Sequence, residues 1–316
     1  MIVSNPIVFS TLSYRALADS IAARGGFERG AVEARHFPDG EVYHRIDSRV
    51  AGRHVAVVGG TIDDADTLEI YDLACGLVKN GVQSLSLAVP YFGYSTMERA
   101  TKPGEIVKAK TRARLFSSIP QSDSGNRMLL LDLHAEGIPH YFEGGIRPVH
   151  LSARELIEQA ARKLAGKDFV IASTDAGRAK WVEALANSLR VPAALVIKRR
   201  LDATQTEIVA VSAEVRGRDV VIYDDMVRTG GSLREAAKAY REAGARRIFA
   251  IATHGVLPGD SLARLEASGL FEAIVTTDSH PRAAALASSF LSVVSVADLF
   301  ASVIGGVEAQ TFPGGR

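Results

Sequence analysis

The chain of 316 residues has a single cysteine, Cys75, which excludes internal disulfides and cysteine-based zinc clusters. The residues around Cys75 are typical of a helix face, so a packed thiol is favoured over a nucleophile. One cysteine suits a reducing compartment. No apolar run approaches the length of a membrane-spanning helix, and the N-terminus has no basic stretch followed by a long apolar core. We therefore expect no membrane partner, no signal peptide and a cytoplasmic location.

The chain also has little net charge, only +1 at pH 7, so its bulk charge attracts neither nucleic acid nor an anionic membrane. Any anion-binding site must be local. Apolar content of 47% and charged content of 23% are those of a soluble globular protein. The length suits two domains of ordinary size.

The most informative stretch is residues 220–233. Val-Val-Ile-Tyr at 220–223 predicts a buried strand, and a helical stretch begins near Arg234. Between them lie the polar residues Asp224, Asp225, Arg228, Thr229, Gly230, Gly231 and Ser232. Glycines and a helix N-terminus can direct backbone N–H groups at a phosphate. The acidic pair suits ribose hydroxyls or a magnesium ion. The alternative is an ordinary strand-to-helix turn with a serine cap.

Three further segments each allow two interpretations. Pro38-Asp39-Gly40 predicts a hairpin turn, whose tip with Phe37 and Glu41 can also frame a purine. His134 follows a predicted strand and can bind a metal, contact a phosphate or cap a helix. Residues 198–200, Lys-Arg-Arg, form either a surface run or a group that steadies a transferring phosphoryl chain.

Predicted strands and helices alternate almost throughout, which indicates parallel sheets with helices on both faces. Polar side chains recur where strands end, and one site built from several strand ends explains this. These side chains are Asp132, Asp175, Lys198, Asp224 and Asp278. We interpret residues 142–149 as a turn-rich connection between the halves, and the basic helix over 107–117 as a solvated surface.

Several of these blocks together resemble the ribose-phosphate pyrophosphokinase (PRPP synthetase) family, from about Phe9 to Phe300. The matching blocks are residues 36–41, 90–94 with Arg99, 132–135, 198–200 and 224–232. The resemblance implies an α/β fold of two phosphoribosyltransferase-like domains, each a mainly parallel sheet flanked by helices. We expect domains at residues 1–147 and 148–300, with a tail at 301–316.

The resemblance also implies a reaction, in which pyrophosphate moves from Mg-ATP to the 1-hydroxyl of ribose 5-phosphate and AMP leaves. It implies a Mg²⁺ cofactor and a homo-oligomer, a dimer or hexamer, with no nucleic-acid or membrane partner. It assigns catalysis to Lys198, Arg200 and His134, and metal binding to His134 and Asp175. The expected ATP-binding residues are Phe37, Asp39, Glu41, Arg99 and His134. The expected ribose-phosphate-binding residues are Asp224, Asp225, Arg228, Thr229, Gly230, Gly231 and Ser232.

Two positions depart from the family pattern. Thr96-Met97 stands where the family usually has Arg-Gln, and Arg228 stands where the sugar loop often has Asp. Loss of a charge-assisted contact to ATP costs roughly 1.5–3 kcal/mol. Arg228 suits an acceptor with an extra anionic group. The alternatives are therefore a pyrophosphokinase with another acceptor such as ADP-ribose, a non-catalytic regulatory homologue, or a phosphoribosyltransferase.

Overall fold

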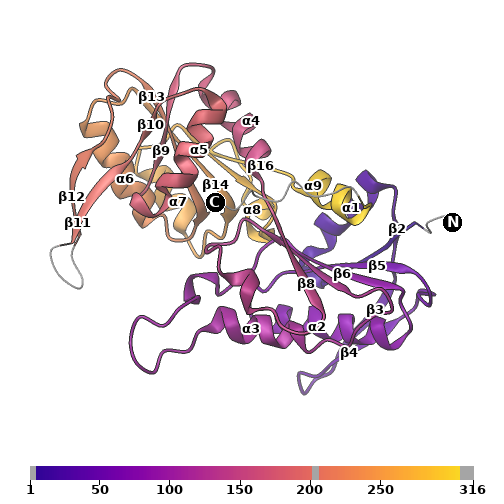
Figure 1. Cartoon of the computed structure of the whole chain (residues 1–316). Coiled ribbons are helices and arrows are strands. Elements are labelled where there is room, and N and C mark those ends of the chain that lie inside the picture. Colours follow the sequence, from indigo (N-terminus) through magenta and orange to yellow (C-terminus); the bar gives the residue numbers. More distant parts are fainter. Residues whose placement is uncertain (1–4, 201–205, 307–316) are drawn as a thin grey trace. The chain divides into compact units, whose positions relative to one another are not determined.

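A computed structural model describes residues 5–200 and 206–306, and within these the side chains of all but residues 176, 197–200 and 206–210. The chain forms two compact units (Figure 1). Unit 1 comprises residues 1–152 and 295–316, and unit 2 comprises residues 153–294. The expected domain boundaries fell after residues 147 and 300 instead, because the sequence analysis did not pair the C-terminal helix with the N-terminal half.

Unit 1 contains a six-stranded sheet in the order β2-β1-β5-β6-β7-β8, with every pairing parallel. Its strands are β1 (Ile7–Ser10), β2 (Glu28–Arg29), β5 (His54–Val58), β6 (Ser84–Val89), β7 (Asn126–Leu131) and β8 (Ile146–Leu151). A separate antiparallel hairpin is formed by β3 (Val32–His36) and β4 (Val42–Ile46). The central strands are near-continuous apolar runs because helices cover both of their faces.

The helices of unit 1 lie on the two faces of this sheet (Figure 1). They are α1 (Arg15–Gly25), α2 (Asp64–Lys79), α3 (Lys108–Ser117) and α9 (Ala297–Ile304), with short 3-10 turns η1 (Leu12–Tyr14), η2 (Ser95–Met97) and η3 (Ile138–Tyr141). The C-terminal helix α9 packs on α1. Ala297, Phe300 and Ile304 are buried, so the last helix completes the core of the first unit.

Unit 2 repeats the topology of unit 1, with a parallel sheet in the order β10-β9-β13-β14-β15-β16 and an antiparallel hairpin. The sheet strands are β9 (Phe169–Ser173), β10 (Ala193–Ala194), β13 (Asp219–Val227), β14 (Arg247–Gly255), β15 (Ala273–Thr277) and β16 (Leu291–Val294). The hairpin strands are β11 (Val196–Arg200) and β12 (Thr206–Val211). In both units the hairpin follows the edge strand and precedes the return to the middle of the sheet.

Helices cover both faces of the sheet of unit 2 (Figure 1). They are α4 (Arg154–Ala165), α5 (Ala179–Leu189), α6 (Gly231–Glu242), α7 (Ser261–Ala267) and α8 (Pro281–Ala285), with the 3-10 turn η4 (Ala176–Arg178) before α5. Trp181 of α5 stacks on Tyr223 of β13, with ring centroids 3.8 Å apart. Side chains alternate along a strand, so Tyr223 and Asp225 share the α5 face of the sheet while Ile222 and Asp224 share the α6 face.

The expected fold class is confirmed, but one segment was predicted wrongly. Residues 142–149 were interpreted as a turn-rich connection, whereas Ile146–Leu151 form strand β8. Proline lacks a backbone N–H and is therefore tolerated in a sheet mainly at an edge. β8 is an edge strand of its sheet, which is why it can hold Pro148.

Candidate active site

The sheet order of unit 2 creates a crevice between β9 and β13. From β9 the chain moves outward to the edge strand β10, and it then returns to β13 on the other side of β9. The loops that follow β9 and β13 therefore part at the carboxyl edge of the sheet, and ligands of open α/β sheets bind at such a point. These two loops contain residues 174–178 and 228–230. Polar residues predicted separately from the sequence thus belong to one crevice.

The loop after β13 is closely fitted to its surroundings. Gly230 has a φ of +74°, and a Cβ at this position would lie 2.7 Å from the Leu265 side chain. Only glycine meets both conditions without strain. Gly231 then begins α6, while Arg228, Thr229 and Ser232 are exposed. The first turn of a helix leaves backbone N–H groups without intrahelical partners, and these favour an anion. The predicted phosphate loop therefore has a suitable backbone geometry.

Asp224 and Asp225 lie at the end of β13, beside the loop that follows β9. Thr174 Oγ1 donates to Asp224 Oδ2 at 3.0 Å, and the Asp225 backbone N–H donates to Asp224 Oδ1 at 2.9 Å. Burial raises the pKa of Asp224 well above its ordinary value, and the neighbouring charge of Asp225 raises this pKa further. The guanidinium of Arg178 opposes this effect. Two adjacent carboxylates in a partly desolvated site require such a counter-ion.

Arg178 provides this counter-ion and was not expected from the sequence. Its Nη2 lies 2.5 Å from Asp225 Oδ2 and its Nε lies 4.0 Å from Asp224 Oδ1. The Arg178 side chain is 18% exposed, and that of Asp225 is 5% exposed. The sequence offered no signal for this pair, because 47 residues separate Arg178 from Asp225 along the chain.

Asp175 and the lysine-arginine run lie close to the same crevice in the backbone. Asp175 Oδ1 accepts a hydrogen bond from Gly177 N at 2.8 Å. Strand β11 runs beside η4, and β12 runs beside α6. Lys198 pairs with Ile208 and Arg200 pairs with Thr206 in this hairpin. The side chains of Lys198 and Arg200 lie outside the described residues, so their assigned roles stay predictions.

A buried polar network supports the ends of the next two strands. His254 of β14 lies beside Met226 of β13, and its Nδ1 is 2.8 Å from Ser279 Oγ. Thr277 Oγ1 donates to the backbone carbonyl of Thr253. Burial lowers the pKa of His280 to about 4, and the charges of His254 and Arg282 act in the same direction. The polar end of β15 therefore stabilises the scaffold under the sugar loop, which the sequence analysis had not predicted.

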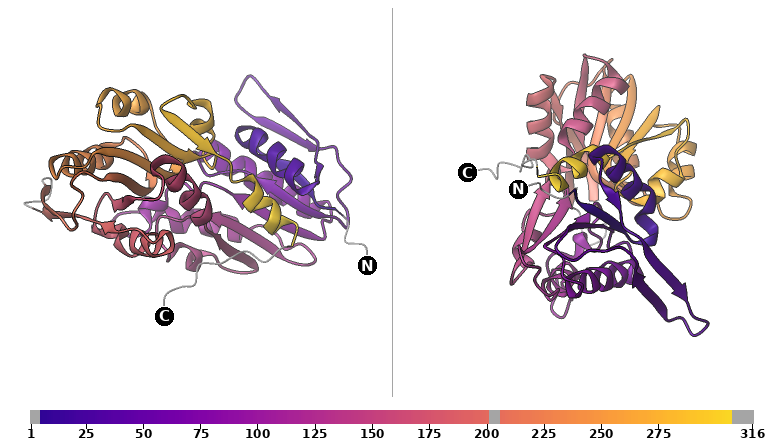
Figure 2. Two further views of the ribbon diagram at one scale, coloured as in Figure 1. Left: turned by 90° about the horizontal axis from the view of Figure 1, so that it is seen from above. Right: turned by 90° about the vertical axis from the view of Figure 1, so that its right-hand side faces the viewer.

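The hairpin of unit 1 has the turn chemistry that its sequence indicated. Phe37 N donates to the Glu41 carbonyl at 2.9 Å, and Glu41 N donates to Asp39 Oδ1 at 3.1 Å. Gly40 has a φ of +96°. The hairpin extends away from the sheet of its unit (Figure 2). The Phe37 ring is 47% exposed. An exposed aromatic ring on such a tip can stack on a base, although no contact here tests this role.

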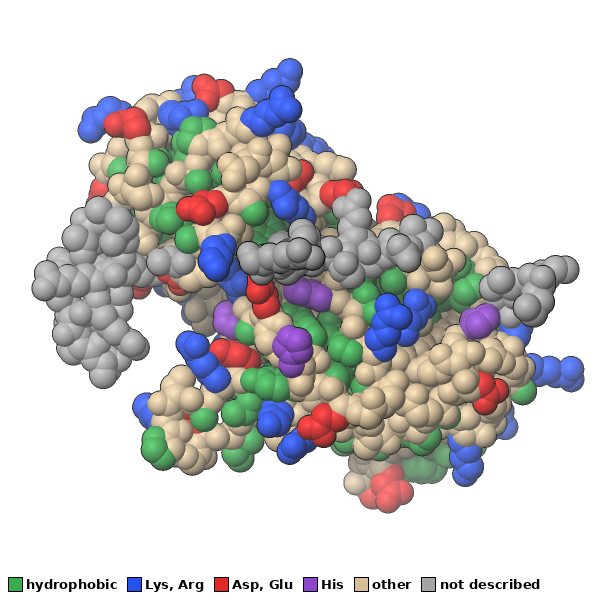
Figure 3. Space-filling model, in the orientation of Figure 1, with side chains coloured by type: hydrophobic (Ala, Val, Ile, Leu, Met, Phe, Trp, Pro, Cys, Tyr) green, Lys and Arg blue, Asp and Glu red, His purple; other side chains and the backbone are tan. Residues whose placement is uncertain are grey.

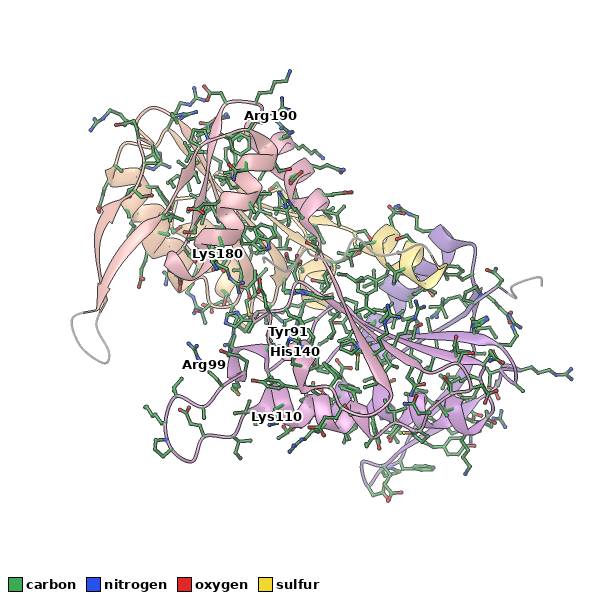
Figure 4. All side chains as sticks on the ribbon, viewed as in Figure 1. Tyr91, Arg99, Lys110, His140, Lys180 and Arg190 are labelled. Carbon is green, nitrogen blue, oxygen red and sulfur yellow. The ribbon has the colours of Figure 1, made fainter. Side chains whose placement is uncertain are left out.

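His134 follows the end of β7 and is half-buried. Asp132 has a φ of +35°, an unusual value for a residue with a side chain. Leu133 N donates to His150 Nε2 at 3.0 Å, which requires a neutral imidazole, and burial lowers the pKa of His150. This sharp turn determines where His134 leaves the strand. Arg99 lies on a loop of the same unit, with its side chain 78% exposed (Figure 4).

A basic cluster surrounds Tyr94, at the end of the segment 90–94. Lys108 Nζ lies 4.8 Å and Arg112 Cζ lies 4.9 Å from the centroid of the Tyr94 ring. Tyr94 Oη donates to Asp64 Oδ1 at 2.9 Å, and Arg112 forms an ion pair with the same carboxylate. The interpretation of 107–117 as merely solvated missed this arrangement. Spacing of three to four residues on a helix was the available signal.

Charges of both signs are interspersed on the face shown in Figure 3. Across residues 5–200 and 206–306, no helix is long and apolar enough to cross a membrane. No group of three or more His, Cys, Asp or Glu side chains that could hold a metal ion occurs in the same part of the chain. A metal would therefore take few of its ligands from side chains of this kind.

Comparison with known proteins identifies the class. The N-terminal domain of ribose phosphate pyrophosphokinase matches residues 6–119, and the phosphoribosyl synthetase-associated domain matches residues 182–310. The crystal structure of phosphoribosylpyrophosphate synthetase from Mycobacterium smegmatis superposes with a TM-score of 0.85 and 28% identity. That match covers 96% of this chain and 99% of the other. The chain thus has the two-domain α/β fold of a transferase that handles phosphorylated ribose.

Two curated relatives narrow the class. Ribose-phosphate pyrophosphokinase 2 of Enterococcus faecalis is 34% identical over 276 residues, 86% of this chain and 83% of that protein. Ribose-phosphate pyrophosphokinase 1 of Listeria monocytogenes is 32% identical over 272 residues, 85% of this chain and 84% of that protein. The chain belongs to the ribose-phosphate pyrophosphokinase family, as its motifs had indicated.

Proposed function

We propose that the protein transfers pyrophosphate from Mg-ATP to the 1-hydroxyl of ribose 5-phosphate, giving 5-phosphoribosyl 1-pyrophosphate and AMP. One observation carries this proposal: an acidic pair and a phosphate-type loop meet at the crevice between β9 and β13. The relatives named ribose-phosphate pyrophosphokinase support the same reaction.

The sugar phosphate would bind in unit 2. Backbone N–H groups at the start of α6, with the hydroxyls of Thr229 and Ser232, would hold its 5-phosphate. Asp224 and Asp225 would accept hydrogen bonds from the ribose hydroxyls, since ionised carboxylates are pure acceptors. This arrangement would position the 1-hydroxyl without a strong general base. Positioning alone can supply a large part of the rate enhancement of a displacement.

The transferring group develops negative charge that cations must balance. Lys198 and Arg200 would supply that charge, and their strand β11 runs beside the turn that contains Arg178. ATP would bind through the hairpin residues Phe37, Asp39 and Glu41, with Arg99 and His134 on its phosphates. These assignments rest on the family membership.

The residues present fit a magnesium ion that is bound mainly by phosphate and water, because Mg²⁺ usually keeps several waters and few protein ligands. Asp175 would provide a carboxylate oxygen and His134 an imidazole nitrogen. A bound Mg²⁺ would neutralise phosphate charge and so favour attack on the β-phosphorus. Asp175 is held by the Gly177 N–H, which orients its carboxylate.

We also propose that the protein is a homo-oligomer. Phe37, Val42 and Tyr43 of the hairpin are large apolar side chains that are 41% to 47% exposed in the single chain. A second copy would cover this apolar surface. Light scattering on a size-exclusion column measures the assembly, and a monomer at all concentrations would contradict this part of the proposal.

The decisive experiment incubates the purified protein with ATP, Mg²⁺ and each of several sugar phosphates, and measures AMP and the ³¹P spectrum of the product. We expect AMP to form with ribose 5-phosphate and to disappear when EDTA removes the metal. Arg228 is an exposed cation on the sugar loop, which favours testing ADP-ribose beside it. A clear preference for ADP-ribose would replace the acceptor, and no turnover with any acceptor would favour a non-catalytic homologue.

A further inference from the structure

Arg178 is the one residue in the crevice of unit 2 to which neither the sequence motifs nor the proposed reaction assigns a role. It is the last residue of η4 and the N-cap of α5. Its guanidinium lies 2.5 Å from Asp225, and its Nε lies 4.0 Å from Asp224. It therefore contacts both carboxylates that the proposed reaction assigns to the sugar.

The position of Arg178 is electrostatically unusual. The N-terminus of a helix carries partial positive charge, so a cation at the start of α5 is disfavoured by the helix itself. The side chain is also largely buried, at 18% exposed, which makes an unpaired guanidinium costly. The acidic pair compensates for both effects. An arginine here therefore depends on Asp224 and Asp225, and the carboxylates in turn depend on the arginine.

We propose that Arg178 is a positioning residue for the sugar, which holds Asp224 and Asp225 ionised and oriented so that they accept hydrogen bonds from two neighbouring hydroxyls. This inference rests on the proposed function and extends it to a residue outside the sugar loop. The three side chains carry a net charge of −1, so the pair retains acceptor strength after Arg178 is bound.

The acceptor capacity of the two carboxylates supports this role. An ionised carboxylate has two oxygens with about four lone-pair positions. Asp224 receives the Thr174 hydroxyl on Oδ2 and the Asp225 N–H on Oδ1, and Asp225 receives Arg178 on Oδ2. Positions therefore remain on both residues for donors from a ligand. Because ionised carboxylates only accept, the pair selects hydroxyl groups on a sugar.

The test replaces Arg178 in the full-length protein and compares two variants with a control. Arg178→Gln removes the charge, and Arg178→Lys keeps it without the planar fork. Arg190→Gln makes the same chemical change at the other end of α5, where the labelled Lys180 and Arg190 mark the two ends of that helix (Figure 4). Steady-state kinetics yields KM for each substrate, kcat and the pH profile.

With Arg178→Gln we expect KM for ribose 5-phosphate to rise about tenfold or more, while KM for ATP stays within about threefold of wild type. The acidic limb of kcat/KM for the sugar should move to higher pH, because Asp224 loses its cation. Arg178→Lys should recover part of the affinity, and Arg190→Gln should behave as wild type. A general structural defect would not produce this separation of the two KM values.

Other results would overturn the inference. A KM for ribose 5-phosphate that is unchanged or lower in Arg178→Gln would mean that the arginine is idle or blocks the sugar. Equal losses in both KM values, with an early Trp181 fluorescence transition in urea, would indicate misfolding, and Arg178→Lys without recovery would then reject the role.

The proposed function can fail separately. Wild-type protein that makes no AMP from ribose 5-phosphate contradicts the reaction but leaves the ion pair to be tested by ¹³C NMR of the Asp224 carboxyl carbon. Titration of that signal about one pH unit higher in Arg178→Gln than in wild type would support the counter-ion role. Identical titration curves would reject it.

Discussion

The most quantitative prediction concerns Asp219, at the start of β13. Its carboxylate is 1% exposed and accepts four hydrogen bonds from two arginines. Arg247 donates at 2.6 and 3.2 Å, and Arg246 donates twice at 2.9 Å. Hydrogen bonds from Arg247, followed by those from Arg246, lower the pKa of Asp219 from 3.8 to about 2. This carboxylate anchors the amino end of the strand that carries the acidic pair.

The pKa difference gives a stability contribution with a definite pH dependence. A shift of about 1.8 pH units corresponds to about 2.4 kcal/mol at pH 7. Because the folded pKa is lower than the unfolded pKa, the stabilisation is complete above pH 3.8 and is lost as pH falls through 2. At pH 3 the same linkage leaves about 1.3 kcal/mol. Asp219→Asn should therefore reduce the free energy of unfolding by about 2 kcal/mol at pH 7 and by less at pH 3.

The single tryptophan makes the measurement specific for unit 2. Trp181 stacks on Tyr223, which lies on the same strand as Asp219. Urea unfolding followed by Trp181 fluorescence, at several pH values between 3 and 7, gives the difference between wild type and variant. Asp168→Asn is the matched control, because its pair with Arg218 is 87% exposed at the aspartate and should contribute under about 0.5 kcal/mol. A difference below about 0.5 kcal/mol for Asp219→Asn, or one that grows toward acid, would refute the reasoning.

Three further predictions concern unit 2 and the hairpin. Gly230→Ala places a methyl group 2.7 Å from Leu265 at a φ of +74°, so KM for ribose 5-phosphate should rise about tenfold or more while KM for ATP changes little; unchanged kinetics would contradict the fit of the loop. Tyr240→Phe removes a buried hydroxyl that donates to the Ser173 and Ala194 carbonyls, and should lower the free energy of unfolding by about 1–2 kcal/mol in the same fluorescence assay. Phe37→Ala should raise KM for ATP about five- to tenfold with an unfolding free energy within about 0.5 kcal/mol of wild type, and an equal KM would remove the ring from the ATP site.

The sequence by itself determined the fold class and the family. Alternating apolar runs and helical stretches specify parallel sheets, because burial of a strand on both faces is visible in its composition. The turn at residues 37–41 was equally local, since proline, aspartate and glycine act on their own backbone. The acidic pair and glycine loop after residue 223 lie on one continuous segment, so their order was readable.

Only the tertiary structure decided which distant residues meet. Arg178 reaches Asp225 because β9 and β13 are neighbours in the sheet, and the order of strands is not encoded in any local pattern. Ile146–Leu151 became a strand despite Pro148 because it lies at a sheet edge. Helix α9 packs on α1, from which about 270 residues separate it, for the same reason. Local propensity determines the elements, whereas contacts between remote elements depend on how their apolar faces are buried together.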